Sequence, residues 1–109
     1  MTTTYRVLGQ SNPVAATNTN LYTVPASRAA VLSTLAVCNQ GAATTFRVAV
    51  RPAGAAIAAQ HFIAHNVDLP ASDTVFLTLG ITLATTDIVT VFAGTATVSF
   101  SLFGAEMVV

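Results

Sequence analysis

The feature that most limits the possible folds of this chain is a two-residue alternation of apolar and polar side chains in short segments. The alternation is clearest in Thr45–Arg51, Thr74–Leu79 and Thr97–Leu102, where Val, Thr, Ile, Phe and Leu predominate. Successive side chains of a β-strand point to opposite faces, and these residue types are favoured in strands. Each segment is therefore predicted to be a strand with one face in the core.

Turn signals separate these segments at short intervals, as in Ser11-Asn12-Pro13 and Pro52-Ala53-Gly54. The pattern predicts about eight strands with short connections. The first seven are Tyr5–Gln10, Asn20–Val24, Ala29–Asn39, Thr45–Arg51, His61–Asp68, Thr74–Leu79 and Ile88–Phe92, and the last follows Gly94-Thr95. Asn39-Gln40-Gly41 predicts a hairpin between the third and fourth strands.

The alanine-rich stretch Ala55–His65 does not fit the alternation. Alanine favours a helix, but Pro52 and Gly54 interrupt the chain before this stretch and Pro70 interrupts it afterwards. We expect a loop through Gln60 followed by the strand that begins at His61. A short helix at 55–60 is the alternative.

Eight short strands without a long helix indicate one all-β domain over residues 1–109, an antiparallel β-sandwich that is jelly-roll-like or immunoglobulin-like. Residues 1–4 are expected to form a flexible arm or to dock on a partner. Cys38 is the only cysteine, so it cannot form an internal disulfide. Its apolar neighbours predict a buried, unreactive thiol.

Charge is scarce in this chain. Hydrophobic residues make up 53% of it and charged residues 7%, whereas about a quarter of the residues of an ordinary domain are charged. Lysine is absent, and the charged residues are Arg6, Arg28, Arg47, Arg51, Asp68, Asp73, Asp87 and Glu106. Because so uncharged a surface tends to self-associate, we expect partners to cover much of it, as in a subunit of an assembly.

The charge balance also bears on the kind of partner. A formal net charge of zero argues against nucleic acid and against a polybasic membrane patch. Met1–Arg6 lacks the pattern of a secretory signal, and the longest near-apolar run, Ala29–Cys38, is about half as long as a membrane helix. We expect synthesis in the cytosol and no membrane association.

The residues capable of chemistry form no recognisable active site. His61 and His65 have a spacing that can hold a metal ion on a helix, but no third ligand is nearby, and on a strand the imidazoles would lie roughly 13 Å apart. Asp73 and Asp87 lie in turn signals, where aspartate bonds its own backbone. No Gly-x-Ser-x-Gly elbow or phosphate-binding glycine pattern occurs. We therefore predict no catalytic residue, cofactor or metal site.

Four residues are candidates for an interface. Arg47 and Arg51 share one strand face, which is either a solvated surface or a contact stripe for acidic groups of a neighbouring subunit. Phe76 and Phe103 lie opposite the main apolar set of their strands. Either both sheet faces are covered locally, or these two rings contact another subunit.

Several strand-and-turn phrases between Leu21 and Glu106 resemble small virion proteins of tailed bacteriophages. The phrases are Leu21–Ala26, Ala30–Asn39, Phe46–Ala53, Leu77–Leu83 and Val98–Gly104. The resemblance implies a non-enzymatic β-sandwich of the virion, such as a capsid cement or decoration protein. Proteins of this kind sit on the capsid lattice as dimers or trimers and brace the major capsid protein.

Other functions fit parts of the same pattern. The resemblance equally allows a collar, tail or baseplate accessory protein. A receptor- or glycan-binding module is a second reading, since jelly rolls also serve as lectins, but the chain has no Trp and only two Tyr. A small metal-dependent hydrolase is a third reading and requires His61 and His65 to converge with a carboxylate.

Overall fold

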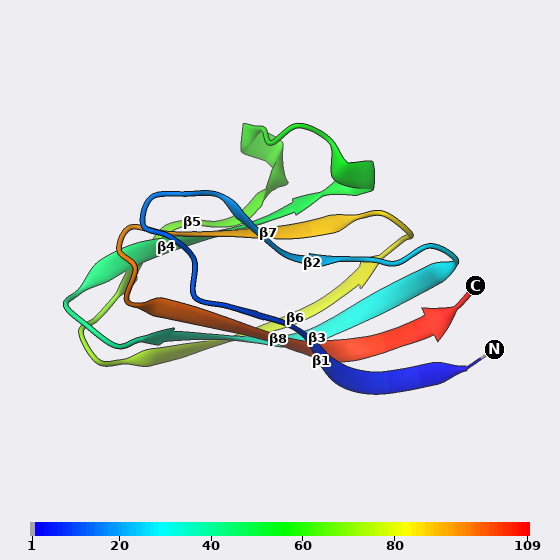
Figure 1. Cartoon of the computed structure of the whole chain (residues 1–109), viewed down its shortest axis with the longest axis horizontal. Helices are drawn as coiled ribbons and strands as arrows, with labels where there is room; N and C mark the ends of the chain where they lie inside the picture. The colour runs from blue at the N-terminus through cyan, green and yellow to red at the C-terminus, as the bar shows by residue number, and fades with distance from the viewer. Residues whose placement is uncertain (1) are drawn as a thin grey trace.

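In the computed structural model, which describes residues 2–109, eight antiparallel strands form two sheets that pack face to face (Figure 1). This confirms the predicted all-β sandwich. The strands are β1 (Thr3–Ser11), β2 (Thr19–Thr23), β3 (Arg28–Asn39), β4 (Thr44–Arg51), β5 (Phe62–Leu69), β6 (Thr74–Leu83), β7 (Ile88–Ala93) and β8 (Val98–Val108).

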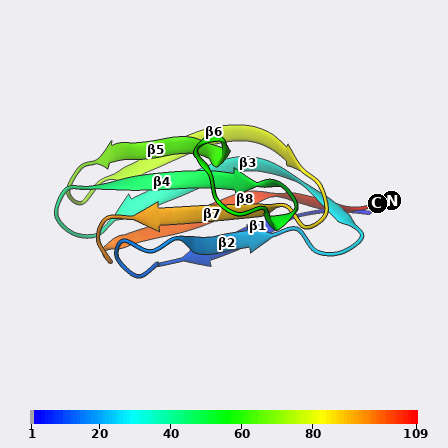
Figure 2. The same cartoon turned by 90° about the horizontal axis from the view of Figure 1, so that it is seen from above.

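The strand order identifies the sandwich as a jelly roll. One sheet, here called sheet A, has the order β1-β8-β3-β6, and the other, sheet B, has the order β2-β7-β4-β5 (Figure 2). Within residues 2–109 the β4–β5 connection is the only one that stays in one sheet, and all others cross between sheets. Of the two topologies that the sequence left open, this arrangement is the jelly roll.

The predicted hairpin at Asn39-Gln40-Gly41 is wrong, because β3 and β4 belong to different sheets. Asn39 is buried at the crossing, and its side-chain amide donates to the carbonyl oxygens of Ala42 and Pro70. Its side-chain oxygen accepts from the Gly41 N–H and the Thr97 hydroxyl. These bonds satisfy the backbone while the chain passes from one layer to the other.

The ends of the strands differ from the predicted bounds in several places. β1 begins at Thr3, and the Thr2 carbonyl accepts a hydrogen bond from the Val108 N–H, so residues 2–4 lie along the sheet instead of forming an arm. Met1 lies outside the described residues. β6 continues to Leu83 rather than ending at Leu79. Cys38 is half-buried on the outer face of sheet A, not in the core as predicted.

The alanine-rich stretch forms the long connection between β4 and β5. It contains a 3-10 turn at each end, η1 (Pro52–Gly54) and η2 (Ala59–His61), with an open loop between them. The expected loop is confirmed for residues 55–58. The 3-10 helix η2 takes the place of its last residues, the alternative helix at 55–60 is not formed as one element, and the strand begins at Phe62 instead of His61. This connection stands above sheet B in Figure 1. No helix of the described chain has the length and apolar character needed to span a membrane.

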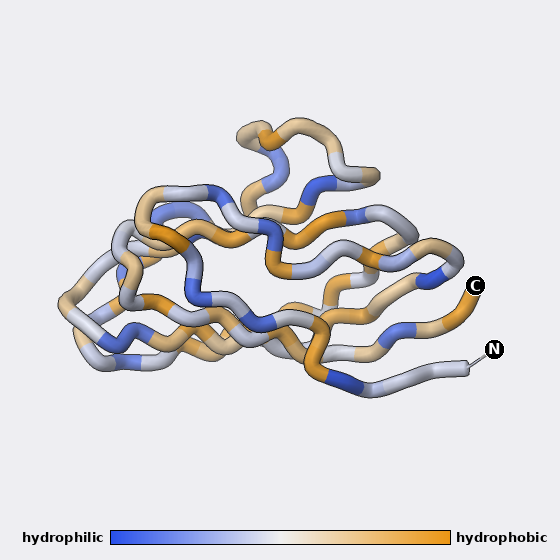
Figure 3. Tube along the Cα trace, viewed as in Figure 1, coloured by the Kyte–Doolittle hydropathy of each residue, from blue (hydrophilic) through white to orange (hydrophobic). Residues whose placement is uncertain are grey.

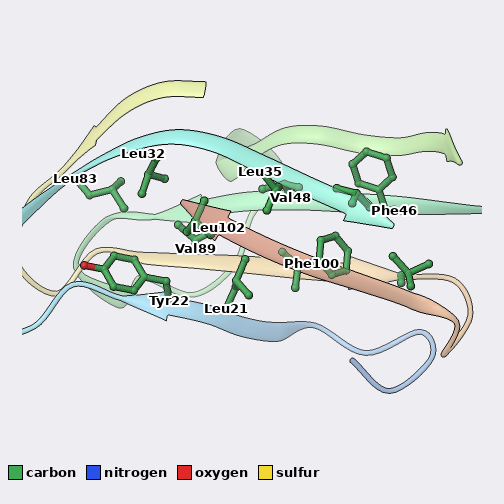
Figure 4. Packing of buried hydrophobic residues seen from close by; sticks show 14 of the residues in the cluster. Leu21, Tyr22, Leu32, Leu35, Phe46, Val48, Leu83, Val89, Phe100 and Leu102 are labelled. Atoms are coloured by element: carbon green, nitrogen blue, oxygen red, sulfur yellow. The ribbon is translucent and has the colours of Figure 1, made fainter. Parts of the chain in front are cut away.

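The core lies between the two sheets and contains only the inward-facing half of each strand. Phe46 of sheet B meets Phe100 of sheet A edge to face, with ring centroids 6.3 Å apart (Figure 4). Burial of one such side chain stabilises the fold by about 1.5–3 kcal/mol. Apolar residues are spread in short stretches over the whole chain, as Figure 3 shows, because each strand supplies only alternate residues to the core.

A line of register shifts crosses sheet A near its middle. Leu8 is an extra residue in β1 opposite β8, and Ser33 is an extra residue in β3 opposite β8. On the other side of β3, Ser33 faces both Leu79 and Gly80 of β6, and Gly80 has the positive φ of 60° typical of a bulge. As a result Ser33 and Thr34 both point outward, and the inward pattern resumes at Leu35.

Candidate interaction surface

The outer face of sheet A carries no charged side chain among the described residues. The register places four residues in each of two outward rows: Tyr5, Ala105, Val31 and Thr82, then Gln10, Ser101, Ala36 and Phe76. The remaining outward positions are also Ala, Cys, Met, Phe, Ser, Thr or Val. We call this surface the uncharged face. A whole sheet face without Asp, Glu, Arg or Lys lacks the usual means of keeping a surface solvated.

Phe103 lies in a shallow hollow of the uncharged face. The hollow is lined beside it by Tyr5, Val7, Val31 and Ala105, and also by Ser33, Gly104 and Arg6, whose guanidinium group bonds Glu106. Tyr5 is 84% exposed and Val7 is 45% exposed, whereas Phe103 is half-buried between its neighbours. The predicted interface residue is thus one member of an apolar cluster drawn from three strands.

Phe76 is also on the uncharged face, but it stands apart from Phe103. It lies on the edge strand β6 opposite Ala36, one outward row away from the row that contains Phe103. Its side chain is 68% exposed. The structure therefore places the two predicted phenylalanines on the same surface without contact between them in the sheet register.

Arg47 and Arg51 share the outer face of sheet B, as predicted, but their guanidinium groups are bound within their own chain. Arg47 Nε donates to the Asn66 side-chain oxygen at 2.7 Å, and its guanidinium carbon lies 4.3 Å from the centre of the Phe92 ring. Stacking on an aromatic ring and a hydrogen bond hold this side chain flat against the sheet.

Arg51 is bound more completely than Arg47. Its three nitrogens donate to the Thr90 hydroxyl, the Ala55 carbonyl and the Asn20 side-chain oxygen. Ala49, which lies between the two arginines in β4, is buried where the β4–β5 connection lies over the sheet. These contacts favour a sheet face whose arginines are bound within their own chain over a stripe that pairs with carboxylates of a neighbouring subunit.

The main buried polar site lies where both ends of the chain meet. Glu106 of β8 is buried, and its carboxylate accepts a hydrogen bond from the Tyr22 hydroxyl at 2.5 Å and one from Arg6 at 3.3 Å. Arg28 lies 4.0 Å from the same carboxylate, and both arginine side chains are about half exposed. The site ties together β1, β2, β3 and β8.

The environment of this carboxylate changes the acidity of its neighbour. Burial raises the pKa of Tyr22 far above its usual range, and the hydrogen bond to Glu106 and the negative charge of Glu106 raise it further. The positive charges of Arg6 and Arg28 act in the opposite direction and are outweighed. Tyr22 is therefore a permanent hydrogen-bond donor to the buried carboxylate at neutral pH.

The histidines are held separately by local contacts. His61 Nδ1 accepts a hydrogen bond from the Ala58 N–H within η2, and the His65 ring packs edge to face on Phe62 with centroids 4.9 Å apart. Among residues 2–109, no group of three His, Cys, Asp or Glu side chains converges as metal ligands would.

Asp73 and Asp87 cap turns, as predicted. Asp73 accepts a hydrogen bond from the N–H of Thr74. Asp87 accepts one from Ala84 in its own turn and a second from Ala53 in η1. Asp87 thus also fastens the start of the β4–β5 connection to the β6–β7 turn, a tertiary role that its turn signal did not reveal.

Sequence reasoning found Phe76 and Phe103 but missed the rest of the uncharged face and the Glu106 site. The alternation in β3, β6 and β8 already showed uncharged residues at every second position, but only the strand order shows that these rows are neighbours. No protein family, curated protein or solved structure matches this chain. The chemistry of its surface is therefore the basis for a functional proposal.

Proposed function

We propose that this chain is a non-enzymatic structural protein of a bacteriophage virion, a capsid cement or decoration protein that braces major capsid subunits. The observation that carries the proposal is the uncharged face of sheet A, with Tyr5, Val7 and Val31 around Phe103. Exposed apolar patches on soluble proteins mark surfaces that bind other proteins.

Two further points support the proposal. The strand-and-turn phrases of the sequence resemble phage virion proteins, and the jelly roll is an architecture that viral capsid proteins use. The second point is an analogy of fold and carries less weight than the surface chemistry.

In this proposal the uncharged face lies against the capsid shell. The charged groups lie elsewhere: the Glu106 site is at the end of the sandwich where the termini lie, and Arg47 and Arg51 are bound within sheet B. Of the charged residues, Arg6 alone lines the hollow of this face, and it already bonds Glu106. Docking of sheet A would therefore desolvate few ionised groups of this chain, which limits the main cost of burying a polar surface.

The direct test adds the purified protein to expanded capsid shells of the phage that encodes it, prepared without the protein. Negative-stain images and co-sedimentation should show saturable decoration, and decorated shells should resist heating better than bare shells. Shells that neither bind the protein nor gain stability would remove the capsid assignment.

A further inference from the structure

The two long flanks of the sandwich differ in how well they are closed. At the β1/β2 flank the backbones approach so closely that a Cβ on Gly9 would collide with the Leu21 carbonyl. At the β5/β6 flank the inward-facing side chains remain half-exposed and line a shallow apolar groove. The groove residues are Ile63, Ala64, Val67, Phe76, Leu77, Thr78, Leu79 and Ile81.

The edge strand at this flank lacks most of the features that normally prevent strand addition, and the one it has is the bulge at Leu79 and Gly80. β6 has ten residues, is paired on one side by β3, and contains no charged residue and no proline. Natural edge strands are commonly short, charged or interrupted, because a free row of N–H and C=O groups pairs with other strands. The bulge at Leu79 and Gly80 leaves Thr74–Thr78 as the regular segment of β6, with the exposed Phe76 at its centre.

We propose that β6 pairs with β6 of a second copy of this chain, antiparallel about a two-fold axis near Phe76. The two copies of sheet A then form one continuous sheet. An antiparallel strand is complementary to itself in hydrogen bonding, and a two-fold axis makes each contact occur twice. The same axis turns the apolar grooves of the two copies toward each other.

Charge and strand length together select this edge over the other three. Self-pairing of β6 brings no like charges together, because all of its residues are neutral. β1 carries Arg6, β5 carries Asp68 and His65, and β2 has only five residues. Like charges placed opposite each other destabilise a strand pair, so β6 is the best edge for a second copy. This inference does not depend on a role in a virion.

The first test measures mass in solution. Light scattering during gel filtration should give twice the chain mass of 11.2 kDa for the wild type. Phe76→Lys places two ammonium groups opposite each other at the axis and should reduce the mass to that of one chain. Phe76→Thr is the uncharged control at the same site and should remain a dimer. Tyr5→Lys adds the same charge to the opposite edge and should also remain a dimer.

The second test locates the axis and does not require a destabilising change. In a Cys38→Ala background, Phe76→Cys gives one cysteine per chain. Directly opposed residues of antiparallel strands have Cα atoms about 4.5–5.5 Å apart, which suits a disulfide. Mild oxidation should give a covalent dimer for Phe76→Cys and little for Tyr5→Cys. A monomeric wild type, a dimer that survives Phe76→Lys, or equal cross-linking at both sites would overturn the inference.

Discussion

Glu106 is the residue whose environment most constrains the ends of the chain. Its buried carboxylate is bound by the Tyr22 hydroxyl and faces two arginines. We predict that Tyr22→Phe lowers the free energy of unfolding by about 1–3 kcal/mol, because the buried carboxylate loses a donor that water cannot replace. Urea denaturation measures this change.

A matched double-mutant cycle separates this bond from simple packing. Glu106→Gln keeps a side chain of the same shape, and the coupling between Tyr22→Phe and Glu106→Gln should be about 0.5–3 kcal/mol. Additive effects of the two substitutions would contradict the role assigned to the Tyr22–Glu106 bond.

The raised pKa of Tyr22 gives the protein a specific response to alkali. Unfolded tyrosine loses its proton near pH 10, whereas Tyr22 in the folded protein keeps its proton to higher pH. The resulting stabilisation is fully present below about pH 10 and is lost as the pH rises toward the folded-state pKa. The free energy of unfolding of the wild type should therefore fall above about pH 10, and that of the Tyr22→Phe variant should fall less steeply. Equal slopes of the unfolding free energy against pH for the wild type and Tyr22→Phe would refute this explanation.

At the scale of elements, the closed β1/β2 flank depends on one glycine. A Cβ on Gly9 would meet the Leu21 carbonyl, which belongs to backbone and cannot rotate away. We predict that Gly9→Ala costs about 1–3 kcal/mol by overpacking, whereas Gln10→Ala, on the exposed side of the same strand, costs much less. Thermal unfolding measures the stability of both variants. Equal stability of Gly9→Ala and Gln10→Ala would show that the flank is not tightly closed.

The sequence was sufficient to predict strands and their faces but not their partners. Alternation identifies which side of Thr74–Leu79 is apolar, because that property is local to the strand. The turn signal at Asn39-Gln40-Gly41 looks the same for a hairpin and for a crossing between sheets. Its outcome depends on the bonds that Asn39 makes to Pro70 and Thr97, which are distant in sequence.

The same limit applies to the candidate surface. Phe76 and Phe103 were identifiable because each interrupts the polar side of its own strand. Tyr5 and Val31 became neighbours of Phe103 only through the order β1-β8-β3. The Arg47 and Arg51 interactions were likewise hidden, because Asn66, Asn20 and Thr90 come from other strands.

At the scale of the whole molecule, charge is distributed unequally between the two outer faces: Arg47 and Arg51 lie on that of sheet B, whereas that of sheet A is the uncharged face. We predict that Val31→Lys, in the centre of the uncharged face, weakens binding to capsid shells by about tenfold or more, a loss of about 1.4 kcal/mol or more. Val14→Lys introduces the same change at a residue that is exposed outside this face and should bind normally. Co-sedimentation across a concentration series measures the affinity of each variant for the shells, and circular dichroism verifies that each is folded. Equal affinities of the two variants would rule out this face as the binding surface.

In the proposed function, sheet A of this jelly roll lies against a capsid shell. A density map of the intact virion at a resolution that shows sheets as layers is the decisive measurement. We expect copies of the sandwich on the outside of the shell, with the uncharged face toward the major capsid protein and Arg47 and Arg51 away from it. Copies confined to the tail, or copies with sheet A facing solvent, would contradict it.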